Sequence, residues 1–484
     1  MPRFSNVLLL CSDEHDPRHS GFMGNTGVHT PWMDRLAARG AVFTQAYTPS
    51  PICVPARASL ATGRWVHDHR CWDNAIAYAG HQPSWAHRLR AGGAGAQSIG
   101  KLHYRSAEDD TGFDPQLEAM HLAGDGQVWG CVRDPLPERS DGAGLFRQLG
   151  AGESDYNRFD RRVADGAIGW LEDRARLDAA QRARQPALLF AGFVAPHFPL
   201  VVPQSYLDLY PTASVPWPKL RPETGYQRHP WVQRQAEFNH LDAQLENDGR
   251  RRLAIASYLG LVSFIDAQIG RVLQALEALG LADDTLVIYT SDHGDNLGAR
   301  GMWNKSLLYR ESTAVPMVLA GPGVAQRRCD TPCTLVDVFP TVLDALGVAP
   351  HAQDQALPGR SLLGFTETDA PGRVAFSEYH AVGSPTGAFM VTQGRYKYHH
   401  YVGYAPELFD LQDDPEETRD LHALPSHRDV CTHMERLLRA IVDPLAADRL
   451  AKDDQNALVA RHGGRELALT KGKGGATPVP RGRP

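Results

Sequence analysis

The sequence predicts an α/β protein with a large, mostly parallel sheet flanked by helices and a smaller antiparallel α/β subdomain towards the C-terminal end. Three observations lead to this fold class. Short apolar runs alternate with helical patterns over the first 364 residues, and short strands joined by a hairpin turn follow. The chain of 484 residues also exceeds the length, about 250–300 residues, at which a single core stops growing. We therefore expect a sheet domain over residues 1–364, the subdomain over 365–450 and a tail over 451–484.

The first part of the chain alternates expected strands and helices. Strands are expected at residues 6–11, 41–48, 96–99, 187–194 and 285–290. Helices are expected at residues 31–39, 83–91, 159–174 and 253–279. The pair Thr30-Pro31 opens the first helix and Gly40 closes it, because proline suits the first helical position and glycine the position after the last. Residues 203–240 are rich in proline and aromatic residues and lack periodicity, which predicts a long ordered loop near the functional site.

The C-terminal residues have a different pattern. The segments "RVAFSEYH" (373–380) and "GAFMVTQGRYKYHHYV" (387–402) predict short strands, with Gln393-Gly394 as the turn of a hairpin. A helix is expected near residues 424–445. The final stretch "TKGKGGATPVPRGRP" (470–484) is rich in glycine, proline and basic residues, so we expect it to be flexible or to contact a neighbouring subunit.

The composition narrows the class of protein. Hydrophobic residues make up 42% of the chain and charged residues 22%, which is ordinary for a globular protein, and the net charge of -6 argues against nucleic-acid binding. The apolar run Val7 to Cys11 is too short for a signal sequence or a membrane span, so we expect a cytoplasmic protein with no membrane partner. The 7 scattered cysteines contain no C-x-x-C pair, which predicts neither a disulfide framework nor a zinc knuckle.

Polar residues follow most of the expected strands of the large sheet. Ligands of open α/β sheets bind beyond the carboxyl ends of the strands, so these residues are the candidates for a functional site. In chain order they are Asp13 and Glu14, Lys101 and His103, His197, and Asp292 and His293, with Lys305 a dozen residues later.

Four of these residues suit a metal ion. Asp13, Glu14, Asp292 and His293 offer hard oxygen ligands and one imidazole, which favours Ca²⁺, Mg²⁺ or Mn²⁺ over a zinc site built on thiolates. The alternative is that each aspartate only caps the following turn or helix.

The remaining candidates are cationic or can become so. Arg57, Lys101 and Lys305, with His103 and His197, would neutralise a tetrahedral oxyanion held against the metal. The alternative for each histidine is a packing or hydrogen-bonding role.

The stretch "CVPARASLATGR" (53–64) raises the question of what Cys53 does. Pro55 can open a helix that Gly63 ends, which places Cys53 at a helix N-terminus, where anions are favoured, and Arg57 one turn further on. Cys53 could be an inert buried residue, or a thiolate nucleophile, because a helix N-terminus lowers the pKa of a thiol. Cysteine phosphatases have an arginine six residues after the cysteine, whereas residue 59 is Ser, so that mechanism does not fit.

The same residues resemble a known family. "CVPAR" matches the C-x-P-x-R sulfatase signature, and "GKLHY" (100–104), "PHFP" (196–199), "SDHGDNLG" (291–298) and the N-terminal acidic pair occur in the family's order. The chain therefore resembles type I sulfatases of the alkaline-phosphatase superfamily from about residue 5 to residue 421. The resemblance is greatest to choline sulfatases and phosphonate monoester hydrolases, although Glu14 stands where this branch often has Gln and the C-terminal tail differs.

The resemblance implies a sulfuric ester hydrolase that acts on a small aryl or alkyl sulfate. A formylglycine-generating enzyme would convert Cys53 to formylglycine, and its hydrated diol, bound to one divalent metal, would attack sulfur and form a covalent sulfated enzyme. By family motif, Arg57 and Lys101 would hold the diol, and His103 would take the proton that drives elimination of sulfate. His197 and Lys305 would contact the sulfate and protonate the leaving oxygen, and Asp13, Glu14, Asp292 and His293 would bind Ca²⁺, Mn²⁺ or Mg²⁺.

Further expectations concern the substrate and the assembly. Asn74, in "CWDNAIAY" (71–78), could hydrogen-bond the substrate or satisfy the preceding turn. The resemblance implies a homo-oligomer, either a dimer or a tetramer. Two other functions stay open: a phosphonate monoester or phosphodiester hydrolase with the same site, and a metal-binding anion sensor with an unmodified Cys53.

Overall fold

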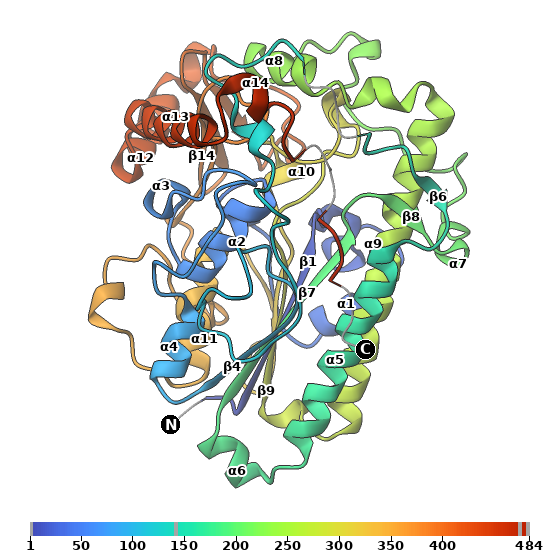
Figure 1. Cartoon of the computed structure of the whole chain (residues 1–484), viewed down its shortest axis with the longest axis vertical. Coiled ribbons are helices and arrows are strands. Elements are labelled where there is room, and N and C mark those ends of the chain that lie inside the picture. The colour runs from blue at the N-terminus through green and yellow to red at the C-terminus, as the bar shows by residue number, and fades with distance from the viewer. Residues whose placement is uncertain (1–2, 140–143, 473–476, 481–484) are drawn as a thin grey trace.

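The large domain is built on one eight-stranded sheet that runs through the middle of the molecule (Figure 1). The computed structural model describes residues 3–139, 144–472 and 477–480. The strands follow the spatial order β11 (Arg327–Cys329), β2 (Ala41–Phe43), β10 (Met317–Ala320), β9 (Thr285–Ser291), β1 (Asn6–Asp13), β7 (Ala187–Pro196), β4 (Gly95–Lys101) and β5 (Gln116–Met120). Neighbours are parallel except that β10 is antiparallel to both β9 and β2, so the predicted mostly parallel sheet is confirmed.

The central strand β1 is buried along its whole length because both faces of the sheet are covered. Its side chains alternate between two hydrophobic clusters: Leu8 and Leu10 belong to one, and Val7 and Leu9 to the other. A strand buried on both faces needs a continuous apolar run, which is what the sequence has at this position.

Helices cover both faces (Figure 1). The first cluster contains residues of α1 (Pro31–Ala37), α5 (Asp155–Ala175) and α9 (Asp248–Ala278). The second contains residues of α2 (Cys53–Thr62), α4 (Trp85–Ala91) and α11 (Val338–Ala345). The helix α9 has the length and hydropathy of a membrane span, but 89% of its most apolar window is buried inside the protein, as expected for a core helix. Shorter elements are α3 (Val66–His69), α6 (Ala179–Arg184), α10 (Arg310–Thr313), β6 (Leu149–Ala151) and β8 (Leu200–Val202).

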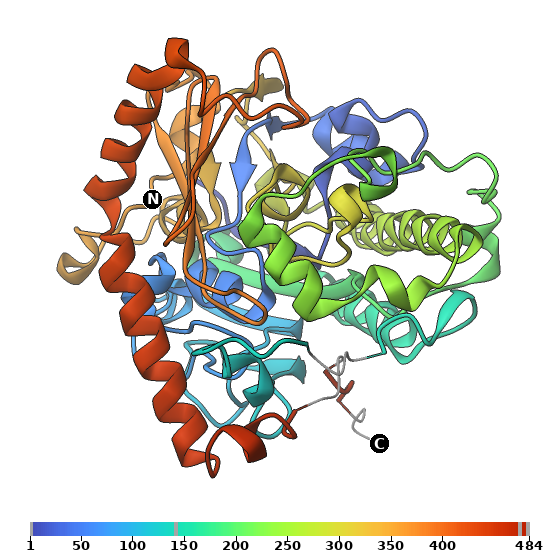
Figure 2. The ribbon, with the colours of Figure 1, turned by 90° about the horizontal axis from the view of Figure 1, so that it is seen from above.

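The C-terminal part contains a four-stranded antiparallel sheet, as the sequence predicts. Its strands are β13 (Val374–Tyr379), β14 (Ala388–Gln393), β15 (Tyr396–Tyr401) and β16 (Glu407–Asp410). The hairpin is confirmed, but its turn is Gly394-Arg395, one residue later than predicted: Gln393 pairs with Tyr396, and Gly394 has a φ of 59°. The amphipathic helix α12 (Arg428–Ile441) packs on this sheet through Met434 and Leu438. Two more helices, α13 (Pro444–Arg461) and α14 (Arg465–Ala468), follow, and Figure 2 shows the long C-terminal helices along one edge of the molecule.

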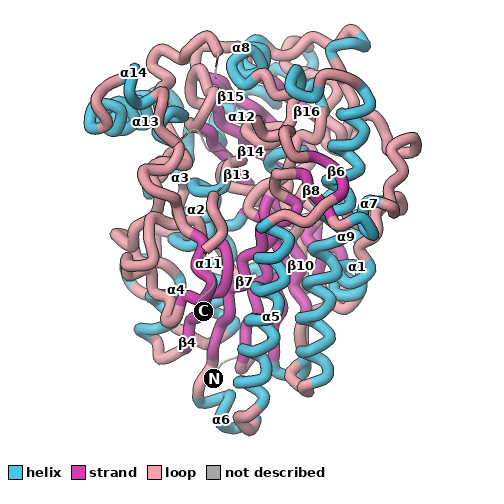
Figure 3. Tube along the Cα trace, turned by 45° about the vertical axis from the view of Figure 1, so that its right-hand side comes forward, coloured by secondary structure: helices cyan, strands magenta, loops and turns pink. Residues whose placement is uncertain are grey.

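The structure differs from the sequence prediction in several places, and the strands β5, β10 and β11 and the helix α11 were not among the expected elements. Residues 41–48 form β2 and a separate β3 (Ala46–Tyr47), which pairs with β12 (Cys333–Thr334) in another sheet. The predicted loop 203–240 contains the helices α7 (Gln204–Leu207) and α8 (Pro230–Asn239) (Figure 3). The helix α8 is stabilised because it buries Trp231 and Phe238. The helix α13 continues past residue 450, where the subdomain was expected to end, into the predicted tail, which starts at residue 451.

Candidate active site

The carboxyl ends of four neighbouring strands bring the candidate residues together. Asp13 ends β1, Lys101 ends β4, His197 follows β7, and Asp292 and His293 follow β9. All five side chains are buried. Gly100, with a φ of 94°, lets β4 pass close to β7, because a side chain there would meet the Gly192 carbonyl oxygen at 2.1 Å.

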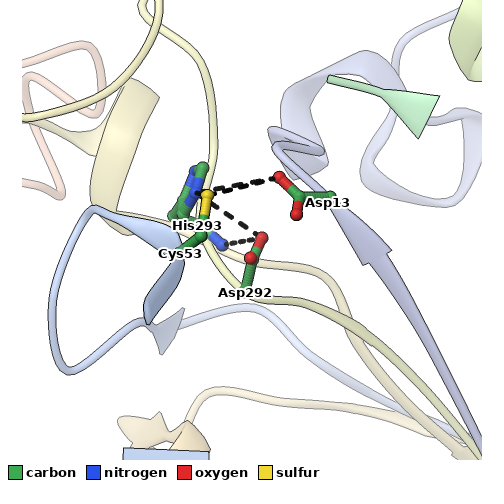
Figure 4. A group of neighbouring side chains, drawn as sticks. All are labelled: Asp13, Cys53, Asp292 and His293. Atoms are coloured by element: carbon green, nitrogen blue, oxygen red, sulfur yellow. Dashed lines mark hydrogen bonds and ion pairs between the residues drawn. The ribbon is translucent and has the colours of Figure 1, made fainter. Parts of the chain in front are cut away.

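Cys53 is the first residue of α2 and points into this group of side chains (Figure 4). The helix starts two residues earlier than predicted, and it ends at Gly63 in the left-handed conformation, as predicted. The Cys53 Sγ atom lies 3.2 Å from His293 Nε2 and 3.8 Å from Asp13 Oδ1. Burial, together with the nearby Asp13 carboxylate, raises the pKa of the Cys53 thiol to about 12. The thiol therefore stays protonated near neutral pH, which disfavours an unmodified thiolate nucleophile.

One group of donor atoms fits a divalent metal ion. Ligand atoms of Asp13, Cys53, Asp292 and His293 all lie within 4.8 Å of one another. His293 Nδ1 lies 3.0 Å from the Gly294 carbonyl oxygen, so Nδ1 carries the proton and Nε2 presents its lone pair to the group. Two carboxylates and a neutral imidazole are ligands that Ca²⁺, Mg²⁺ and Mn²⁺ accept. The residues present therefore fit the predicted metal.

Glu14 lies at the edge of this group, in a second one with Asp13 and His197. Its backbone has a φ of 71°, a left-handed conformation that is uncommon for glutamate, and its amide donates to Asp292 Oδ1 over 3.1 Å. Glu14 Oε2 accepts a hydrogen bond from Lys305 Nζ over 3.0 Å, while the buried Oε1 has no partner among the described residues. Burial raises the pKa of Glu14 to about 8, against the effect of Lys305. An unpartnered carboxylate oxygen here is available to a cation.

Arg57 holds the two aspartates in place. Its Nη2 donates to Asp13 Oδ2 over 2.9 Å, its Nε to Asp292 Oδ2 over 2.7 Å and its Nη1 to the Lys101 carbonyl over 2.6 Å. Lys101 Nζ lies 2.7 Å from the same Asp13 oxygen. Burial lowers the pKa of Arg57, but the charges of Asp292 and Asp13 raise it by a larger amount. The net pKa is above the usual value, so the guanidinium stays charged. Arg57 and Lys101 leave Asp13 Oδ1 free to face Cys53.

Cys53, His103, His197 and Lys305 all line one pocket of about 90 Å³. His197 Nδ1 lies 2.6 Å from the Phe198 carbonyl oxygen, and its Nε2 lies 3.6 Å from Glu14 Oε2. Burial and the neighbouring lysines lower the pKa of both histidines well below the usual range. The structure thus brings His103, His197 and Lys305, three of the predicted residues, to the pocket that Cys53 lines, with both imidazoles neutral.

Asn74 also lines the pocket, but its side chain is already bonded to protein. Its Oδ1 accepts a hydrogen bond from the Val54 amide over 3.1 Å, at the N-terminus of α2. Its Nδ2 donates to Gln127 Oε1 over 3.2 Å. Asn74 therefore fixes the start of the helix that carries Cys53. Other parts of the wall are Trp129, Trp303 and Asn239, the last from the predicted loop.

Three nearby residues were not found from the sequence. Asp295 stands in the quoted motif "SDHGDNLG", yet only its neighbours were assigned roles; burial raises its pKa to about 6 and it contacts Glu14. Thr477 lines the pocket and bonds to His103, and the Tyr156 hydroxyl bonds to the Thr477 carbonyl. No local motif marks the last two, because they reach the site through distant parts of the chain.

Comparisons with known proteins place most of the chain in one family. The sulfatase family model matches residues 5–348, and a model of the C-terminal region of N-sulphoglucosamine sulphohydrolase matches residues 298–443. A choline-sulfatase of Rhizobium meliloti (strain 1021) is 32% identical over 432 residues, which cover 87% of this chain and 83% of that protein. An arylsulfatase K of Danio rerio is 28% identical over 471 residues, which cover 90% of this chain and 84% of that protein.

Solved structures share the fold. A phosphonate monoester hydrolase of Agrobacterium radiobacter superposes with a TM-score of 0.70 at 24% identity, over 91% of this chain and 95% of the other. A phosphonate monoester hydrolase of Silicibacter pomeroyi superposes with a TM-score of 0.69 at 24% identity. The superposition covers 90% of this chain and 94% of the other. The predicted alkaline-phosphatase-like fold is confirmed. The family match covers most of the chain, and the chain therefore belongs to the sulfatase family and is a sulfuric ester hydrolase.

Proposed function

We propose that the protein hydrolyses a small aryl or alkyl sulfate with formylglycine at position 53 as its nucleophile. One observation carries this proposal: Cys53 stands at the start of α2, in the C-x-P-x-R signature, buried against Asp13 and His293 and lining the pocket. A protonated thiol is a poor nucleophile, whereas a hydrated aldehyde has one hydroxyl to attack sulfur and a second to expel the sulfate. Conversion requires a formylglycine-generating enzyme.

The metal would be held by Asp13, Asp292 and His293, with Glu14 at the edge of the site. A bound Ca²⁺, Mg²⁺ or Mn²⁺ would supply Lewis-acid stabilisation of the charge on the sulfate oxygens. Arg57 and Lys101 fix the orientation of Asp13 and place two positive charges next to the buried carboxylates. The cations thereby offset the cost of keeping several carboxylates buried.

His197 and Lys305 would contact the sulfate and protonate the leaving oxygen. Both line the pocket, and Lys305 is charged: although burial lowers its pKa, the neighbouring Cys53, Glu14 and Asp13 raise it above the usual value. A bound sulfate ester brings negative charge beside His197, which favours the protonated imidazole. His103 would take the proton from the second hydroxyl when sulfate leaves.

The test starts with protein coexpressed with a formylglycine-generating enzyme. We expect the peptide that contains residue 53 to lose about 18 Da, the difference between a thiol and an aldehyde. Second-order rate constants are then compared for a sulfate monoester, a phosphate diester and a phosphonate monoester of the same phenol, with Cys53→Ala as the inactive control. Greater activity on the diester or the phosphonate would replace the proposal with the phosphonate monoester or phosphodiester hydrolase. Full activity of unconverted protein would refute the formylglycine mechanism.

A further inference from the structure

A short C-terminal segment, Thr477–Pro480, enters the pocket from a part of the chain that none of the sulfatase motifs include. The Thr477 hydroxyl lies 3.0 Å from His103 Nε2. The Thr477 carbonyl accepts a hydrogen bond from the Tyr156 hydroxyl over 2.6 Å. Val479 packs against the first hydrophobic cluster, the one that contains residues of α1, α5 and α9. In Figure 1 the segment is the dark red stretch near the upper ends of β1 and β7.

The chain before this segment is also attached to the pocket wall. The Trp129 amide donates to the Lys471 carbonyl over 3.2 Å, and the Trp129 indole donates to the Gly472 carbonyl over 3.1 Å. Trp129 itself lines the pocket and stacks on Phe238 of α8, with 6.2 Å between ring centroids. Contacts at Lys471–Gly472 and at Thr477–Val479 therefore bring the C-terminal residues to the same wall.

His103 depends on Thr477 for its hydrogen bonding. Its backbone is left-handed, with a φ of 58°, and the ring is buried. Nε2 is bonded to Thr477, whereas Nδ1 has no partner among the described residues. A neutral imidazole carries its proton on one nitrogen, and the hydrogen bond at that nitrogen decides which. When the hydroxyl accepts from Nε2–H, Nδ1 keeps its lone pair and can act as a base.

We propose that Thr477 is a positioning residue that sets the orientation and the tautomer of His103 for the release of sulfate. This inference rests on the proposed function. In the release step the free hydroxyl on the former Cys53 carbon loses its proton to His103, and its oxygen forms the aldehyde double bond. The bond between that carbon and the sulfate oxygen breaks, and sulfate leaves with the electron pair. Without Thr477 the base is misoriented, so the first half of the reaction proceeds and the second is slowed.

The experiment compares Thr477→Val, which keeps the shape but removes the hydroxyl, with Thr477→Ser, which restores it. Thr470→Val is the matched control, because Thr470 is exposed and, within the described part of the chain, its hydroxyl bonds only the Leu467 carbonyl. All proteins carry formylglycine, verified by mass spectrometry. Release of the phenol from an aryl sulfate is followed from milliseconds to steady state.

We expect Thr477→Val to release a burst of phenol and then turn over at least about tenfold more slowly. Sulfated residue 53 should accumulate, and KM should fall with kcat, so that kcat/KM stays near the wild-type value. Thr477→Ser should recover most of kcat, and Thr470→Val should match the wild type.

If the wild-type enzyme is active, two results would overturn the inference. A Thr477→Val enzyme with wild-type kcat would show that the hydroxyl is dispensable. A loss confined to kcat/KM, with no sulfated enzyme, would assign the segment to substrate binding alone. If fully converted wild-type enzyme cleaves none of the sulfate, phosphate and phosphonate esters, the proposed function fails, and the inference fails with it. An active wild type with normal Thr477→Val kinetics refutes only the inference.

Discussion

Lys305 Nζ lies 3.0 Å from Glu14 Oε2, and both side chains are almost fully buried at the edge of the metal group. The pair joins the loop after β9 to the residue that follows β1. Lys305 therefore has two roles: it hydrogen-bonds Glu14 and opposes the effect of burial on the Glu14 pKa, and it presents a cation to the pocket.

Replacing Lys305 by Met should reduce kcat about 10²–10³-fold, the usual effect of removing one group that stabilises transition-state charge. Steady-state kinetics on the best sulfate ester would measure it. Lys452→Met is the control, because Lys452 pairs with Asp448 on α13 and does not line the pocket. A loss of less than about threefold in Lys305→Met would show that the ammonium group does not contact the reacting sulfate.

Removal of the divalent ion should abolish turnover and lower the unfolding temperature. Without the ion, the carboxylates of Asp13 and Asp292 keep only their protein partners. The stability that the folded protein gains by binding the ion is then lost. Dialysis against a chelator, followed by addition of Ca²⁺, Mg²⁺ or Mn²⁺ separately, would measure both effects. Asp292→Asn should bind the ion more weakly. Undiminished activity after verified metal removal would contradict the assignment of this group.

Asn74→Ala should destabilise the protein by about 1 kcal/mol, because the Val54 amide at the start of α2 loses its acceptor. Denaturant unfolding would measure this change. The activity should fall as well. Val54 follows Cys53 in α2, so loss of the bond to the Val54 amide also loosens the position of residue 53. Asn74→Asp keeps an acceptor oxygen and should retain the stability; equal stability of the alanine variant and the wild type would exclude the capping role.

Glu407 predicts a pH dependence of stability that is separate from catalysis. Burial raises its pKa, but hydrogen bonds from His399 and the Tyr309 hydroxyl outweigh burial and lower the pKa to about 2. Because the folded-state pKa lies below the unfolded value, the stabilisation is complete above about pH 5 and is lost as the pH falls towards 2.

The variant Glu407→Gln should therefore lose about 3 kcal/mol of stability at pH 7 and less than half of that at pH 3. Denaturant unfolding at both pH values would measure the difference. The exposed Glu237, whose carboxylate accepts from Gln233, provides the control substitution Glu237→Gln, which should have no comparable effect. An equal loss at both pH values would show that packing, and not ionisation, is responsible.

The sequence predicts the parts of the site that follow strands. Asp13, Lys101 and Asp292 could be found because parallel strands end at one edge of the sheet. Residues at the ends of different strands therefore lie close together in space. Cys53 and Arg57 could be found because one helical turn separates them.

The remaining parts depend on tertiary contacts. Thr477 meets His103 across 374 residues of chain, and a sequence rich in glycine and proline gives no sign of where it packs. The helix α8 was missed because a run of prolines leads up to its first residue and its buried face, which includes Trp231, is short. Residues 473–476 and 481–484 of the predicted flexible tail lie outside the described residues.

The strand β1 is bonded on both sides, to β7 and to β9, so its backbone amides should be among the slowest in the protein to exchange with solvent. The segment Thr477–Pro480, by contrast, belongs to no helix or strand. On mild heating the segment should therefore detach while β1 still protects its amides from deuterium. Catalysis would then fail at a lower temperature than folding, and cooling would restore it.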